Sequence, residues 1–178
     1  GILQFLKGCG RQIATGNKAY FIWLAGLFLA IAIGAVAYSH QYRVGLIATN
    51  IRDQVSWAFY IGNFTFLVGV AAAAVLLVIP AYVYHWGPLK EVVLLGELLA
   101  ISALAMCLLF IMVDMGRPDR LLHMMPVLGT PNWPRSLLTW DALVLNVYLI
   151  LNVTVVLYIL FQAYAGREPN KKILLPLV

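Results

Sequence analysis

Three acidic side chains lie inside or at the edge of long apolar stretches of this chain. Glu97 lies within the stretch 89–115, Asp114 lies at the end of the same stretch, and Asp141 lies near the start of the last one. An ionisable side chain at the centre of a bilayer costs about 3 kcal/mol on insertion scales, so such residues commonly mark a proton, ion or substrate site. The three carboxyl groups therefore predict proton transfer inside a membrane protein.

The two acidic residues of the stretch 89–115 cannot act as a pair. Glu97 and Asp114 are 17 residues apart, which corresponds to about 25 Å along a helix that rises about 1.5 Å per residue. Asp114 lies near Arg117 and Arg120, so a salt bridge is the simpler interpretation of this carboxyl group. Glu97 has no obvious helical partner, since Lys90 lies seven residues earlier. Glu97 is therefore the stronger candidate for a proton path.

Polar side chains recur at helical spacing in two other apolar stretches. Tyr60 and Asn63 are three residues apart and share one helix face. Asp141, Tyr148 and Asn152 are spaced by seven and four residues, which places them on one stripe of a helix. The stripe indicates a hydrated path or a head-group pocket. Hydrogen bonds that only join neighbouring helices are the alternative for both sets.

The positions of the histidines argue against a haem. A b-type haem in a helical bundle needs axial ligands that face each other from within the helices. His40 and His85 end two apolar stretches, and His123 lies in a long loop, so no facing pair exists. His40 and His123 are expected on the same side of the membrane as Asp114 and Asp141. There each could donate a hydrogen bond to a quinone carbonyl or relay protons; a plain surface position is the alternative.

The composition excludes a water-soluble globular protein. Hydrophobic residues make up 63% of the 178 residues and charged ones 11%, against about 25% charged residues in soluble domains. The net charge of +5 comes from cations spread over tails and loops, which is typical of membrane flanks and not of nucleic-acid binding. Cys9 and Cys107 are expected to be packing residues. No cysteine cluster or Walker loop predicts a metal or nucleotide site.

Four apolar stretches are each long enough to cross a bilayer as a helix, which takes about 20 residues. No alternation of period two predicts strands. The expected fold class is therefore all-α integral membrane, with four transmembrane helices in an up-down bundle over residues 19–165. The predicted spans are 19–39, 57–84, 89–115 and 138–165, between an N-terminal tail at 1–18 and a tail at 166–178 that leads to a further helix.

The connections between these spans predict which ends lie together. A tight turn at 85–88 makes the second and third spans an antiparallel hairpin, and the proline-rich loop 116–137 is expected to fold over the mouth of the bundle. Seven basic residues lie on the side of the N-terminus and five on the other. This asymmetry favours a cytoplasmic N-terminus in the cell membrane.

Three segments resemble the NrfD/PsrC family of membrane subunits, over roughly residues 20–165. They read VSWAFYIGNFTFLVGVAAAAV, LLGELLAISALAMCLLFIMVDMGRPDR and LLHMMPVLGTPNWPRSLLTWDALVLN. The element DMGRPDR at Asp114–Arg120 is the most specific of these. Within the family the motifs look most like the DsrP type of the DsrMKJOP complexes of sulfur metabolism, with the QrcD, HybB and alternative-complex-III types as alternatives.

The resemblance implies a haem-free, quinone-binding subunit of a respiratory complex, which does not turn over alone. It implies two four-helix bundles, of which this chain would be the first half. Menaquinone or ubiquinone would exchange electrons with an extracytoplasmic iron–sulfur subunit, and iron–sulfur clusters would lie only in partner subunits. A proton-coupled transporter and a purely structural membrane anchor for a redox subunit are the competing interpretations.

The same resemblance implies roles for particular residues. Carried onto this sequence, it places Tyr60, Asn63, Arg117 and His123 at the quinone, and His40 joins them because of its position. It assigns proton transfer to Glu97, Asp114 and Asp141.

Overall fold

The computed structural model describes residues 2–52, 54–55, 58–76, 84, 87–124, 129–130 and 132–167. Within these ranges the chain is helical, and its only strand-like feature is an isolated antiparallel bridge between Arg52 and Val55. The all-α prediction is therefore confirmed. The helices are α1 (Ile2–Ile13), α2 (Lys18–Val44), η1 (Leu46–Thr49), α3 (Phe59–Leu76), α4 (Gly87–Asp114), η3 (Pro118–Met124) and α5 (Leu137–Tyr164).

Three of these helices are long and apolar enough to cross a membrane. They are Lys18–Val44, Val92–Asp114 and Leu137–Tyr164, while the apolar part of α3, Phe59–Ala74, is shorter. Residues 57 and 77–83 of the predicted second span, the adjoining His85, and residues 168–178 of the predicted C-terminal tail lie outside the described residues. The chain is a multi-pass membrane protein.

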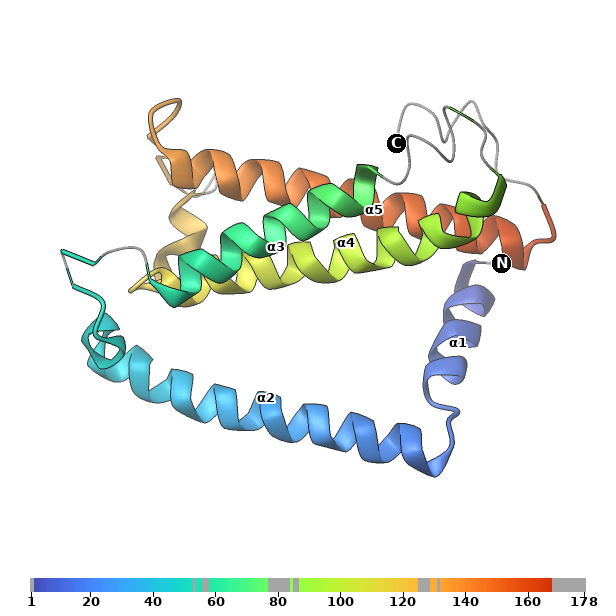
Figure 1. Ribbon diagram of the computed structural model, residues 1–178, viewed down its shortest axis with the longest axis horizontal. Helices are drawn as coiled ribbons and strands as arrows, with labels where there is room; N and C mark the ends of the chain where they lie inside the picture. Colours follow the sequence, from blue (N-terminus) through green and yellow to red (C-terminus); the bar gives the residue numbers. More distant parts are fainter. Residues whose placement is uncertain are drawn as a thin grey trace.

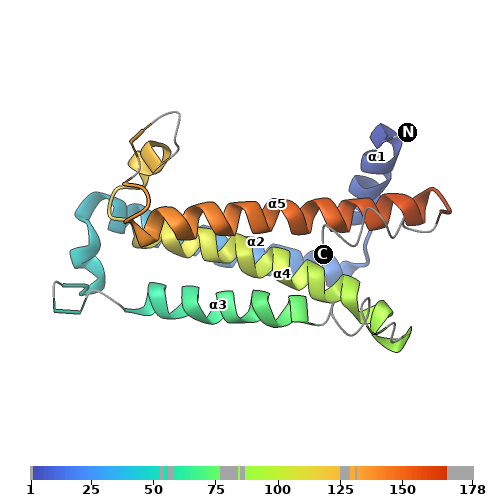
Figure 2. The ribbon, with the colours of Figure 1, turned by 90° about the horizontal axis from the view of Figure 1, so that it is seen from above.

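The long helices run in alternating directions along the chain (Figure 1), and α4 lies between α3 and α5 (Figure 2). Both views show α3, α4 and α5 side by side (Figure 2). Helix α2 stands apart from them along most of its length, and none of its most apolar window is buried. The predicted four-helix bundle is therefore not confirmed; the described helices form a packed group of three with α2 beside it.

Small side chains explain the close packing of α3 on α4. Ala71 and Ala74 on α3 are buried, as are Ala100, Ala103 and Cys107 on α4. The Cys107 thiol lies 3.7 Å from the Phe64 carbonyl oxygen, which it approaches as a donor across this contact. Small residues let helices in a membrane approach closely, so that dispersion contacts hold them together.

Helix α2 is longer than the sequence indicates. The predicted span ends at residue 39, whereas the helix continues to Val44 and ends at Gly45. Gly45 has a positive φ of 89°, and its backbone N–H donates to the Gln41 carbonyl oxygen at 2.7 Å. The extra turn carries Gln41, which is buried although it is polar. The loops that follow α2 and α4 lie at one end of the molecule (Figure 1).

The predicted N-terminal tail also contains structure. Residues Ile2–Ile13 form α1, which lies across the opposite end of the molecule from these loops (Figures 1 and 2).

Candidate functional site

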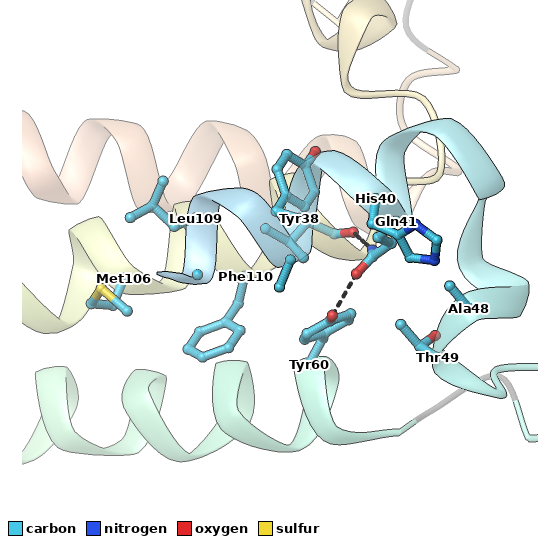
Figure 3. Close-up of a pocket in the computed structure, with 12 residues that line it drawn as sticks. Tyr38, His40, Gln41, Ala48, Thr49, Tyr60, Met106, Leu109 and Phe110 are labelled. Carbon is cyan, nitrogen blue, oxygen red and sulfur yellow. Dashed lines mark hydrogen bonds between the residues drawn. The ribbon is translucent and has the colours of Figure 1, made fainter. Parts of the chain in front are cut away.

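A cavity of about 520 Å³ lies where the C-terminal end of α2 meets the start of α3 and the second half of α4 (Figure 3). Its two ends differ in chemistry. Met106, Leu109 and Phe110 of α4 line the apolar part. The polar part is lined by Tyr38, His40, Gln41, Thr49 and Tyr60. A cavity with one polar end and one apolar end fits an amphipathic ligand.

One amide joins three helices at the polar end. The Tyr60 hydroxyl of α3 donates to Gln41 Oε1 at 2.6 Å. Gln41 Nε2 of α2 donates to the Val113 carbonyl oxygen of α4 at 3.0 Å. Figure 3 shows Tyr60 and Gln41 pointing toward each other across the cavity. Because both ends of the amide are held, its orientation is fixed before any ligand binds.

Two donors at this end have spare hydrogen-bonding capacity. A glutamine amide carries two N–H groups, and only one of those on Gln41 has a partner among the described residues. His40 makes no hydrogen bond within the described part of the chain, and its ring lines the cavity. The Thr49 hydroxyl, by contrast, already donates to the Leu46 carbonyl oxygen at 2.6 Å. Gln41 and His40 are therefore the groups best placed to donate to a ligand acceptor.

A second, much smaller cavity of about 10 Å³ adjoins the polar end. Tyr38, Gln41 and Val113 line both cavities. The small cavity is closed by residues of the two loops, among them Gly45 and Gly116. Its volume is about that of one water-sized sphere.

A separate polar cluster lies between α4 and α5. Glu97 and Asn152 are each 5% exposed, and Tyr148 interacts electrostatically with both of their side chains. Asn152 Nδ2 donates to the Tyr148 carbonyl oxygen at 2.8 Å. Within the described part of the chain, no hydrogen bond or ion pair reaches the Glu97 carboxyl group. Met106, the cavity residue of α4 nearest to Glu97 in sequence, is nine residues away, or about 14 Å along the helix.

The structure separates the predicted quinone residues into two groups. Tyr60 and His40 line the large cavity. Asn63 does not line it, and its amide donates to the Phe59 carbonyl oxygen of its own helix at 2.7 Å. Arg117 and His123 are exposed in the segment that follows α4 and do not line it either.

The predicted proton-transfer residues are also dispersed. Asp114 is partly buried at the end of α4, next to Val113, and Asp141 is exposed in the first turns of α5. No ion pair between described residues joins Asp114 to Arg117 or Arg120, so the simpler interpretation of this carboxyl group is not supported. Glu97, by contrast, interacts electrostatically with Tyr148 of the predicted stripe on α5, and Tyr148 in turn interacts with Asn152 of the same stripe.

Gln41 is the central residue that sequence reasoning missed. It follows His40 directly and lies three residues after Tyr38, so Tyr38 and Gln41 share a helix face. The available signal was a neutral amide at the end of an apolar stretch. It lies between His40 and Tyr42, two residue types that suggest a membrane–water interface.

Comparisons with known proteins give a consistent picture. A family model described as "Polysulphide reductase, NrfD" matches residues 47–177. A membrane subunit of a dimethyl sulfoxide reductase from Halobacterium salinarum is 33% identical over 131 residues, which cover 74% of this chain and 29% of the relative. A selenate reductase subunit from Mesobacillus selenatarsenatis is 27% identical over 156 residues, which cover 88% of this chain and 35% of the relative. The chain thus spans about a third of the length of these relatives. No solved structure gives a significant match.

Proposed function

Because the chain belongs to the NrfD family of polysulphide reductase membrane proteins, we propose that it is a haem-free, quinone-binding membrane subunit of a respiratory reductase complex. It exchanges electrons between menaquinone or ubiquinone and an iron–sulfur subunit on the outer side of the membrane. Both relatives are named as subunits of reductases, one of them as a membrane subunit, which supports a role beside catalytic partners. The proposal has three finer parts. The chain is of the DsrP type, its complex serves sulfur metabolism, and its N-terminus lies in the cytoplasm.

The cavity beside α2 is the observation that carries the proposal. A quinone has two carbonyl oxygens that accept hydrogen bonds, a flat ring and an apolar tail. The cavity offers one N–H of Gln41 and the ring of His40, neither of which has a partner among the described residues. It also offers aromatic rings on Tyr60 and Phe110, whose centroids are 6.4 Å apart. Its volume of about 520 Å³ lies in the usual range of small-molecule sites, about 300–1,000 Å³. Met106 provides apolar surface for the start of the tail.

Reduction of a quinone to a quinol adds two electrons and two protons at the carbonyl oxygens. In this proposal the electrons come from the clusters of the partner. The protons need a group that can exchange them with water, and His40 is both exposed and at the polar end of the cavity. We assign proton delivery to the quinone to His40. Asp114, which directly follows the cavity residue Val113, is the carboxyl group that we place next on the proton route at this end of the molecule.

The remaining predicted residues take outer roles in this proposal. Arg117, His123 and Asp141 are exposed at the same end as the cavity, where they are available to a docked subunit and to protons entering from water. The Asn63 side chain stabilises α3 through its hydrogen bond to the Phe59 carbonyl oxygen of the same helix. We further propose that α2 completes a four-helix bundle with α3, α4 and α5 in a longer two-bundle protein. In this bundle, the hydrogen bonds of Gln41 would hold α2 against α3 and α4.

The cluster around Glu97 favours proton conduction as a second role. A carboxyl group that is 5% exposed between two apolar helices is costly in a membrane and typical of proton relays. A proton-coupled transporter would use the same residue without any electron partner. A structural anchor would need neither the cavity nor Glu97.

The Tyr60→Phe substitution tests the quinone site in the purified, assembled complex. It removes the hydrogen bond to Gln41 and keeps the ring, so we expect quinone affinity to fall about tenfold, the effect of roughly 1.5 kcal/mol. Quinone extracted per complex and the KM for quinol are the measurements. Tyr164→Phe, at the far end of α5, is the matched control. Equal quinone content in both variants and the parent would refute a site at this cavity.

The Glu97→Gln substitution tests the proton role. It keeps the shape of the side chain and removes its exchangeable proton, so we expect quinone content to be unchanged and proton movement in proteoliposomes to fall at least about tenfold. Asp119→Asn, an exposed acidic residue, is the control. Unchanged proton movement per electron would exclude Glu97 from the path.

A further inference from the structure

Helix α1 is amphipathic. At 100° per residue, Ile2, Leu6 and Ile13 fall on one side of the helix, and Lys7 and Arg11 on the other. The three apolar residues are more than half exposed. An exposed apolar stripe opposite a cationic face is the pattern of helices that lie in the plane of a membrane surface.

The helix is held across the end of the spans. The Phe5 ring packs edge-on against Phe161, with centroids 5.6 Å apart, and against Tyr164 at 5.5 Å. The Tyr20 hydroxyl of α2 donates to the Ile13 carbonyl oxygen at 3.0 Å. Figures 1 and 2 both show α1 transverse to α2 and α5. Because it is attached at the ends of two spans, α1 lies at the level where a bilayer meets water.

The charge of this region has one sign. Lys7, Arg11 and Lys18 lie in or next to α1, and residues 1–52 contain no aspartate or glutamate. Anionic phospholipids attract basic side chains at the membrane surface, by about fivefold in association for each charge. The polar face of α1 therefore complements anionic headgroups.

We propose that α1 is an interfacial helix that binds anionic phospholipids, with its apolar stripe among the acyl chains and Lys7, Arg11 and Lys18 on the headgroup phosphates. The contact of Phe5 with α5 joins this lipid-bound helix to the packed group of three helices. The lipid layer, and not a further protein surface, is the occupant that the single-sign charge and the transverse orientation favour. This site is independent of the quinone cavity, which lies at the other end of α2.

Spin labels test the position of the two faces in the full-length protein within its complex, placed in nanodiscs of phosphatidylcholine with about 30% phosphatidylglycerol, a composition chosen to resemble an anionic membrane. Nitroxides are attached at Leu6→Cys or Lys7→Cys in a Cys9→Ser background. We expect oxygen, which concentrates in lipid, to reach the Leu6 label, and a water-soluble nickel reagent to reach the Lys7 label. A Leu6 label that neither reagent reaches would show a protein partner on the stripe and overturn the proposal. A Leu6 label open to nickel would show a helix in water and overturn it equally.

Charge variants test the headgroup contact. The Lys7→Gln/Arg11→Gln pair is expected to lower phosphatidylglycerol retained by the complex about 25-fold in affinity, from about fivefold per charge. The Lys7→Arg/Arg11→Lys pair keeps both charges and should retain the lipid. Quinone content should not change in either. The proposal is overturned if the neutral pair retains the lipid as the parent does, or if the charge-retaining pair loses it as well.

Discussion

The contact of α3 with α4 and the contact of α2 with the same group of helices are built in opposite ways. Ala71 and Ala103 bring α3 and α4 together through fully buried apolar surface. Among the described residues, the hydrogen bonds that join α2 to these helices come from Gln41, and beside this contact a cavity remains. In lipid, small apolar residues allow close approach, whereas a hydrogen bond fixes position without filling space. The ligand site is proposed where packing is incomplete.

The largest effect is expected from a substitution in the closely packed contact of α3 with α4. Ala103 is 3% exposed on α4, and Ala103→Leu adds three carbon atoms where no space exists. Overpacking of this kind costs about 3 kcal/mol. We expect a lower denaturation temperature and less assembled complex.

Ala105→Leu is the control for this change, because Ala105 is exposed on the same helix. Equal thermal stability of the two variants would mean that α3 and α4 are not held by close packing, and the contrast with α2 would fail.

A smaller effect on stability and a specific effect on ligand are expected at the polar contact. Gln41→Leu removes both hydrogen bonds and leaves the Tyr60 hydroxyl without its acceptor. It also removes the Gln41 N–H that is proposed to donate to the quinone. A quinone oxygen left without this donor costs about 2 kcal/mol in binding, so quinone affinity should fall about 30-fold while α3 and α4 stay packed.

Titration of quinone into the assembled complex, beside its thermal denaturation, measures this separation. Ser39→Ala is the neighbouring control, since the Ser39 hydroxyl donates only to the Val36 carbonyl oxygen of α2. If Gln41→Leu lowered thermal stability as much as Ala103→Leu, the two contacts would be equivalent.

The smallest effect is expected at His40, which lines the cavity without holding helices together. His40→Ala should leave thermal stability within about 0.5 kcal/mol, as is usual for surface positions. It should reduce quinone-linked turnover about fivefold, through loss of one donor worth roughly 1 kcal/mol. Arg43→Ala, at an exposed residue of α2 that does not line the cavity, is the comparison. Equal turnover in the two variants would remove His40 from the site.

Features set by local sequence were predictable, and features set by contacts between helices were not. Apolar length predicted the three long spans, whereas the described apolar part of α3 is shorter than predicted. The spacing of Tyr148 and Asn152 predicted a shared helix face but not its interaction with Glu97. No such period predicts that Gln41 contacts Tyr60, because that pairing depends on how α2 turns back through η1. The regular apolar period of α1 was present in the sequence, but a 12-residue helix is too short to be recognised as a span.

The detachment of α2 also bears on how the protein enters the membrane. Its most apolar window has a mean hydropathy of 2.3 and no buried residue, whereas 39% of the corresponding window of α4 is buried within the protein. Helix α2 can therefore pass from the translocon into the lipid without another helix to cover its surface. Helix α4 carries Glu97 at mid-length and inserts at lower cost once α5 is present to cover that carboxyl group. Among these helices, α2 would then insert independently, whereas α4 and α5 would insert together.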